Sequence, residues 1–186
     1  MADIAYPARV GGQGRFIDRV NTDWHERFMW FYMAVVVLHW VEHISQAAQI
    51  WIMGMPRPES LGALGLAAPW LVKTEVLHFG YALFMLAGLF LLRPGFVGAA
   101  RTWWTVSLVI QSWHFIEHSL LQLQAILGFN FFGSQVPASI VQLWVPRPEL
   151  HLIYNAIVFL PMIIAAWMHS HPKPEVAKQL QCTCGT

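Results

Sequence analysis

The sequence predicts an all-α integral membrane protein, in which four transmembrane helices form a bundle built from a duplicated two-helix unit. Three observations predict this fold. Hydrophobic residues make up 56% of the 186 residues and charged residues only 11%, whereas soluble domains carry roughly 25% charged residues. Four apolar runs are long enough to cross about 30 Å of hydrocarbon. A pattern of histidine and glutamate occurs twice along the chain.

The chain divides into two repeats between short polar ends. The four expected spans are residues 28–53, 71–92, 102–127 and 150–168. The expected segments are an N-terminal stretch 1–27, a first repeat 28–93, a second repeat 94–168 and a tail 169–186. The N-terminal stretch lacks an apolar core with a small-residue cleavage site, which argues against a cleaved signal peptide.

The distribution of Lys and Arg predicts the orientation. Eight lie in the two terminal segments and the short middle connection. The other three, Arg57, Lys73 and Arg147, lie on the opposite side, within or next to the two long connections, 54–70 and 128–149. The positive-inside rule therefore places both termini on the cytoplasmic side of the membrane, which we expect to be a bacterial-type inner membrane. The ten tryptophans fit two membrane–water interfaces. The long connections then face outward as interfacial or re-entrant caps, and a net charge of +1 excludes a nucleic-acid partner.

The duplication is the strongest internal signal. The string His39-Trp-Val-Glu42-His43 returns 75 residues later as His114-Phe-Ile-Glu117-His118. Likewise, Leu-His-x-x-Tyr ends at Tyr81 in the second span and at Tyr154 in the fourth. Both halves contain two spans and therefore enter the membrane in the same direction, so the pseudo-two-fold axis runs along the membrane normal.

Ionisable groups gather at membrane depth, where they are costly unless they have a function. At ~1.5 Å per residue, His43 and His118 lie about 15 and 14 Å from the outer ends of their spans. His151 is the exception because it almost begins the fourth span, so either that helix starts earlier or the connection dips inward. The ten predicted metal ligands are His39, Glu42, His43, Glu75, His78, His114, Glu117, His118, Glu149 and His151.

Neutral imidazole together with carboxylate suits transition metals. Helix-borne Glu and His in a bundle core is also how di-metal carboxylate proteins build their sites. We expect one binuclear or two mononuclear sites, with iron or copper favoured over zinc. Any of these side chains can instead orient a ligand. Tyr81 and Tyr154 are assigned to cofactor binding, although simple packing is an alternative for both.

The leading functional hypothesis is a membrane metalloprotein with its site in the outer half of the bilayer. As an enzyme it would be an oxidoreductase acting on O₂, a quinone or another apolar substrate, alone, as a homo-oligomer or within a larger complex. One alternative is a bis-His haem b electron carrier, with His43 facing His78 and His118 facing His151. Another is an ion or proton transporter or an accessory subunit. Purely structural Glu–His pairing is a further reading.

The C-terminal segment carries a weaker signal. His169 and His171 follow the fourth span, and Cys182 and Cys184 lie near the C-terminus. These four side chains can hold a soft metal, but an exposed tail is the favoured interpretation. His25 is interpreted as an interfacial start to the first span.

Overall fold

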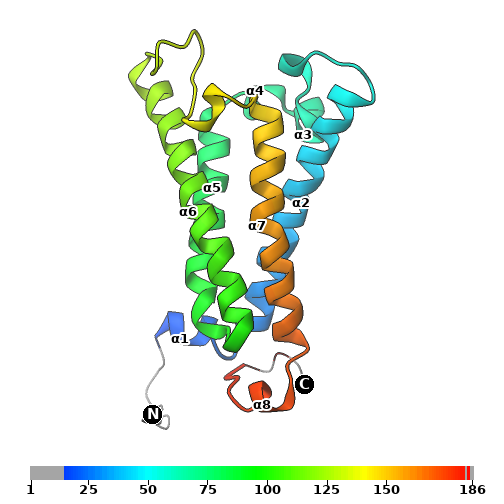
Figure 1. Ribbon diagram of the computed structural model, residues 1–186, viewed down its shortest axis with the longest axis vertical. Coiled ribbons are helices and arrows are strands. Elements are labelled where there is room, and N and C mark those ends of the chain that lie inside the picture. The colour runs from blue at the N-terminus through cyan, green and yellow to red at the C-terminus, as the bar shows by residue number, and fades with distance from the viewer. Residues whose placement is uncertain (1–14, 183, 185–186) are drawn as a thin grey trace.

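The computed structural model describes residues 15–182 and Cys184, and the regular structure within that part of the chain is entirely helical. Four long helices stand side by side (Figure 1). They are α2 (His25–Trp51), α5 (Glu75–Leu92), α6 (Gly98–Leu127) and α7 (Arg147–Ser170). The lower end in Figure 1 carries α1 (Phe16–Val20), η2 (Arg93–Gly95) and α8 (Pro174–Ala177). The upper end carries η1 (Arg57–Glu59), α3 (Gly62–Ala67), α4 (Pro69–Val72) and η3 (Val141–Leu143).

The long helices match the expected spans to within a few residues. Three segments in the described part of the chain are long and apolar enough to cross a membrane: α2, Glu75–Gly95 and α7. Helix α6 has 30 residues but is more polar, because its inward face is lined by hydroxyl, amide, imidazole and carboxyl groups. The buried polar residues of α6 are Ser107, Gln111, His114, Glu117, His118 and Gln124.

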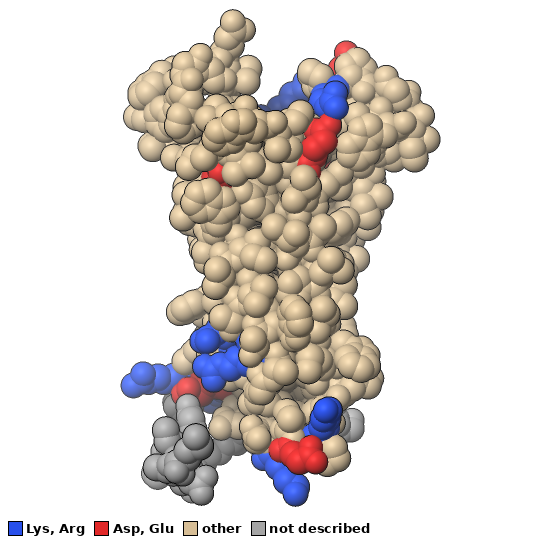
Figure 2. Space-filling model, viewed as in Figure 1, with Lys and Arg blue, Asp and Glu red and all other residues tan. Residues whose placement is uncertain are grey.

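An uncharged belt separates the two ends of the molecule. Figure 2 shows Lys, Arg, Asp and Glu gathered at the upper and lower ends of the visible face, with no charged residue between them. Large apolar side chains point outward along this belt, among them Leu38 (69% exposed) and Phe90 (67% exposed). A surface of this kind is unfavourable in water and favourable in hydrocarbon.

The helices pack unevenly around one another. Helix α6 lies between α5 and α7 and contacts both extensively, whereas α2 makes far fewer contacts with α5 than α6 makes with α7. The lower half is a dense apolar core around Trp104, whose indole Nε1 donates to the Leu89 carbonyl at 2.8 Å. The interface between α2 and α5 is therefore the loosest seam between neighbouring long helices.

Glutamine side chains fasten both long connections to the helix ends. Gln49 of α2 accepts a hydrogen bond from the Gly62 amide at 2.8 Å and donates to the Gly62 carbonyl at 3.1 Å. Gln124 of α6 makes the same pair of bonds with Ala138, at 3.2 and 2.9 Å. Gly62 has φ +75°, and a Cβ there would lie 2.2 Å from Glu42 Oε1. Only glycine fits this conformation and this close approach.

Candidate metal centres

Six histidine rings, contributed by all four long helices, gather in the upper half of the molecule. Within α2 and α6 the pairs stand one turn apart, with centroids 4.4 Å apart for His39–His43 and 4.6 Å for His114–His118. Rings from different helices are also close: 5.4 Å for His43–His151 and 6.1 Å for His78–His118. All six predicted histidines therefore come together, although they are far apart in the sequence.

Backbone carbonyls fix the tautomer of two of these rings. Nδ1 of His151 donates to the Arg147 carbonyl at 2.7 Å, and Nδ1 of His78 donates to the Thr74 carbonyl at 3.0 Å. A carbonyl can only accept, so the proton is on Nδ1 and the lone pair is on Nε2. Histidines that bind metals are commonly oriented in this way. Helix α7 begins at Arg147, one turn before His151, so the earlier helix start explains how His151 reaches the cluster.

His114, His118 and His151 come closest to the geometry of a metal site within the cluster. One nitrogen from each of these three buried rings lies within 4.8 Å of the others, so the group can hold a metal ion. Nε2 of His118 and Nε2 of His151 are 3.3 Å apart, and two nitrogens on one tetrahedral ion are separated by roughly 3.3 Å. In the first half, Nε2 of His39 and Nε2 of His43 lie 2.9 Å apart.

Several buried nitrogen atoms in the cluster lack a partner. Nδ1 of His43, His114 and His118 is buried without a hydrogen bond to any described residue. An unsatisfied buried polar group costs about 1–3 kcal/mol. The histidines therefore do not satisfy one another fully, which is the pattern expected of groups arranged to bind something else.

Two of the four predicted glutamates fasten the connections. The carboxylate of Glu117 accepts from the Ser139 hydroxyl at 2.6 Å and from the Val141 amide at 3.1 Å. Glu42 accepts from the Leu64 amide at 2.8 Å. Both carboxylates thus accept hydrogen bonds from the long connections, and a ligand role for either remains a prediction.

The other two glutamates pair with arginines across the upper end. Arg147 makes two hydrogen bonds to Glu75, at 2.5 and 2.6 Å. Arg57 donates to Glu149 at 2.9 Å from Nε, and this hydrogen bond raises the pKa of the Arg57 guanidinium. Arg57 lies in the connection of the first half and binds an acid in the first turn of α7, whereas Arg147 begins α7 and binds the first residue of α5. The ion pairs therefore join the two halves above His78 and His151.

Each predicted tyrosine lies against the first histidine of its half. The Tyr81 ring stacks on His39 with centroids 3.6 Å apart, and the Tyr154 ring lies 4.5 Å from His114. Their hydroxyl groups bond elsewhere: that of Tyr81 donates to the Met85 sulfur at 3.4 Å, and that of Tyr154 accepts from the Trp113 indole N–H at 2.8 Å. These contacts give the tyrosines a packing role, and direct cofactor binding by them remains a prediction.

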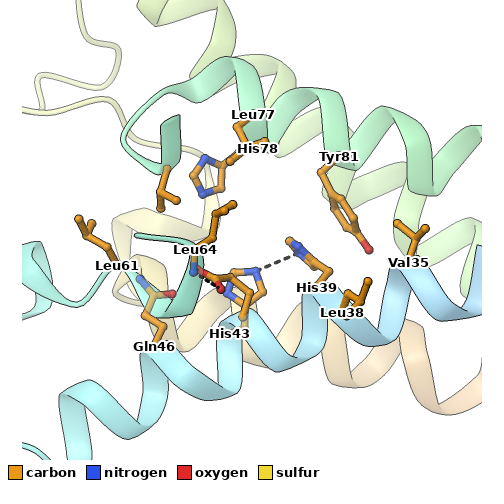
Figure 3. Close-up of a pocket in the computed structure, with 12 residues that line it drawn as sticks. Val35, Leu38, His39, His43, Gln46, Leu61, Leu64, Leu77, His78 and Tyr81 are labelled. Atoms are coloured by element: carbon orange, nitrogen blue, oxygen red, sulfur yellow. Dashed lines mark hydrogen bonds between the residues drawn. The ribbon is translucent and has the colours of Figure 1, made fainter. Parts of the chain in front are cut away.

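An apolar pocket of about 350 Å³ lies in the loose seam between α2 and α5. Figure 3 shows His39, His43 and His78 at its inner wall, with Val35, Leu38 and Leu64 nearby. Among the histidines themselves there is only a small cavity of about 10 Å³, which is enough for one water molecule or ion. The pocket therefore has room for a larger apolar molecule beside the histidine cluster, whereas the cavity among the rings is the size of an ion.

A second opening of about 460 Å³ reaches the cluster from the upper end. It touches His43, His78 and His151, and three cationic side chains also line it: Arg57, Lys73 and Arg147. The histidine cluster therefore has one apolar approach from the side and one charged approach from the end.

A separate group at the lower end can also hold a metal ion. Ligand atoms of His25, His169 and Cys184 lie within 4.8 Å of one another. His169 is 1% exposed and Cys184 is 3% exposed, so the expectation of an exposed tail is wrong for these residues. The chain beyond α7 folds back beneath the helices, an arrangement that no pattern in the sequence predicts. His25 was missed because its place at the helix start resembled that of an interfacial residue.

Comparison with protein-family models, with curated proteins and with solved structures found no match to this chain. A functional proposal for the protein therefore depends on the chemistry of the residues described above.

Proposed function

We propose that this chain is a membrane metalloprotein that carries out redox chemistry on an apolar substrate. The observation that carries the proposal is the convergence of six histidines from four helices on one level, beside an apolar pocket of about 350 Å³. Buried imidazoles that do not satisfy one another are tolerated when a metal ion uses their lone pairs.

The proposal places all four long helices across the membrane as a bundle. Polar α6 would cross because α5 and α7 cover the face that carries its polar groups. The uncharged belt in Figure 2 supports this arrangement. The larger number of Lys and Arg residues at the lower end assigns that end to the cytoplasm, so the histidine cluster lies in the outer half of the bilayer.

Matched contacts in the two halves support an origin by duplication. Gln49 and Gln124, 75 residues apart, each make two hydrogen bonds to one backbone residue of the following connection. Glu42 and Glu117 each accept from a backbone amide of that connection. Repeated side-chain roles of this kind are expected if one two-helix unit was copied and both copies kept their local contacts.

The donor set favours copper. The four carboxylates are engaged by arginines or backbone amides, which leaves neutral imidazoles as the available ligands. Imidazole suits copper, zinc, iron and nickel, and copper binds most tightly in this series. Of the two best-suited ions, copper and zinc, only copper changes its oxidation state, so an all-imidazole site that performs redox chemistry is best assigned to copper.

The two halves have different tasks in this proposal. His114, His118 and His151 form the compact triad that holds the first ion, and His39, His43 and His78 form the equivalent set for a second ion. Only the second set lines the apolar pocket. The triad lies against the tightly packed α6–α7 seam, while the open α2–α5 seam admits substrate from the lipid. Copper bound there would exchange electrons with O₂ or with a quinone-like molecule in the pocket.

Specific observations disfavour the two alternative functions. The space among the histidine rings, about 10 Å³, has no room for a porphyrin, so a bis-His haem does not fit. Below the cluster, Met29, Leu89, Trp104 and Met162 are fully buried and fill the centre of the molecule. This apolar plug does not provide the polar path that an ion transporter requires.

Elemental analysis of the purified protein tests the proposal. We expect one to two copper ions per chain in the wild type, and loss of copper in His114→Ala and His118→Ala. His171→Ala is the matched control because His171 is exposed, and its ring stacks on Trp167 and hydrogen-bonds to the Trp167 carbonyl, away from the cluster. A fully metallated preparation that contains less than one ion per chain at this site, or equal copper in all variants, would contradict the proposal.

A further inference from the structure

The lower end brings together two histidines and two cysteines from three separate segments. His25 begins α2, His169 lies in the last turn of α7, and Cys182 and Cys184 lie beyond α8. The centroids of the two imidazole rings are 4.9 Å apart, and Nε2 of His169 is 3.3 Å from the Cys182 sulfur. This group lies at the opposite end of the helices from the six-histidine cluster, so the inference is independent of the proposed function.

His25 is prepared to act as a ligand. It is 0% exposed, and its Nδ1 donates to the Val20 carbonyl at 3.3 Å. That bond places the lone pair on Nε2, which is buried without any hydrogen-bond partner. A fully buried nitrogen with a free lone pair beside a cysteine sulfur is the arrangement found when a metal ion occupies the space between them.

The Cys182 sulfur lies between the other members of this group. It accepts a hydrogen bond from the Cys184 backbone amide at 3.3 Å and lies 3.3 Å from Nε2 of His169. A divalent cation that binds both sulfurs would displace their protons, because the thiolate is the metal ligand.

We propose that His25, His169, Cys182 and Cys184 form a four-ligand site for Zn²⁺. Two thiolates and two neutral imidazoles are a common donor set of structural zinc. A sulfur and a nitrogen on one tetrahedral zinc ion are separated by roughly 3.6 Å, close to the 3.3 Å between Cys182 and His169. The other ligand atoms need to move only slightly, because His25, His169 and Cys184 already lie within 4.8 Å of one another.

The site has a structural role, because it ties the start of α2 and the end of α7 to the C-terminal segment. Its surroundings are rigid. Phe96 packs against both histidines, with centroids 5.2 Å from His25 and 4.6 Å from His169. A Cβ on Gly95 would lie 2.4 Å from the His25 ring, so η2 holds that ring in place. Zinc therefore completes a site whose histidines are already fixed, and its main effect is to hold the C-terminal segment.

Metal content and cobalt spectroscopy of the full-length protein test the proposal. We expect about one zinc ion per chain, lost in Cys182→Ser/Cys184→Ser and retained in His118→Ala and His171→Ala. Replacing zinc with Co²⁺ is expected to give sulfur-to-cobalt charge-transfer absorption in the wild type and in His118→Ala. The cysteine variant is expected to lack this absorption, and because a site of histidines alone cannot produce it, the signal separates this site from the six-histidine cluster.

Thiol alkylation of the wild-type chain tests the same site without relying on variants, which can misfold. Zinc is expected to slow alkylation of both thiols at least tenfold, and a chelator is expected to restore the rate. Equal alkylation rates with and without zinc would overturn the proposal, as would unchanged zinc content in the double cysteine variant. A disulfide between Cys182 and Cys184 in protein purified without oxidants would also overturn it.

Discussion

Replacing Arg147 with methionine is expected to loosen the upper end and weaken metal binding together. The guanidinium makes two short hydrogen bonds to Glu75, at 2.5 and 2.6 Å. The side chains are 34% and 13% exposed, respectively. Methionine keeps most of the stem volume and removes the charge, so Glu75 is left largely buried without its cation. The backbone of Arg147 also orients His151, which couples this ion pair to the proposed metal triad.

The magnitude follows from partial burial. Removing one partner of a fully buried ion pair costs about 3–5 kcal/mol, and exposed pairs contribute about 0–1 kcal/mol. A pair that is one-third exposed on one side should therefore cost about 2 kcal/mol, a decrease of roughly 4–8 °C in melting temperature for a chain of this size. Loss of orientation at His151 should weaken metal affinity about 10-fold or more. Thermal melting in detergent and metal titration measure the two effects.

The chain offers a matched control for this prediction. Arg57→Met removes the other crossing ion pair, in which the arginine side chain is 51% exposed, and should change stability and metal affinity much less. Glu75→Gln combined with Arg147→Met closes a double-mutant cycle and should show that the two losses are not additive. Equal small effects from Arg147→Met and Arg57→Met, with unchanged metal affinity, would refute the reasoning.

Three further perturbations test other contacts. Gly62→Ala should destabilise the protein more than Gly128→Ala, because both positions have positive φ but only the new Cβ at Gly62 would clash, at 2.2 Å from Glu42. Chemical denaturation measures the free energy of unfolding of both variants, and an equal decrease in the two would contradict the close approach at Gly62. Glu117→Gln should cost about 1–2 kcal/mol by weakening the bonds to its connection while copper content is unchanged, and loss of copper would instead make Glu117 a ligand. Leu38→Trp should narrow the side pocket, preserving copper and slowing oxidation of an added quinol; an unchanged rate would show that substrate enters elsewhere.

The positions of the long helices and the histidine cluster could be predicted from local pattern. The apolar runs predict where the long helices lie, and the spacing of His39 and His43 predicts that both side chains lie on one face. Both predictions need only the geometry of a helix, which does not depend on what the helix packs against. The repeated sequence pattern then relates His114 and His118 to the first pair, since the same spacing places each pair on one face of its helix. The tertiary fold adds how the histidine sets meet across the helices.

The partners of the glutamates could not be predicted in this way. Glu117 contacts Ser139 and Val141 because the connection after α6 folds back over the helix, and periodicity contains no information about irregular backbone. The burial of Cys184 has the same origin. One signal was available in the sequence: His25 and His169 flank the same end of the molecule as the Cys-x-Cys string, so the topology alone placed these four side chains near one another.

Anomalous X-ray diffraction at the copper absorption edge tests the proposed copper site most directly. We expect a strong peak enclosed by His114, His118 and His151, at about 2.0–2.1 Å from one nitrogen of each ring. A map without a peak there, in which the same rings bond only to one another or to ordered water, would contradict it.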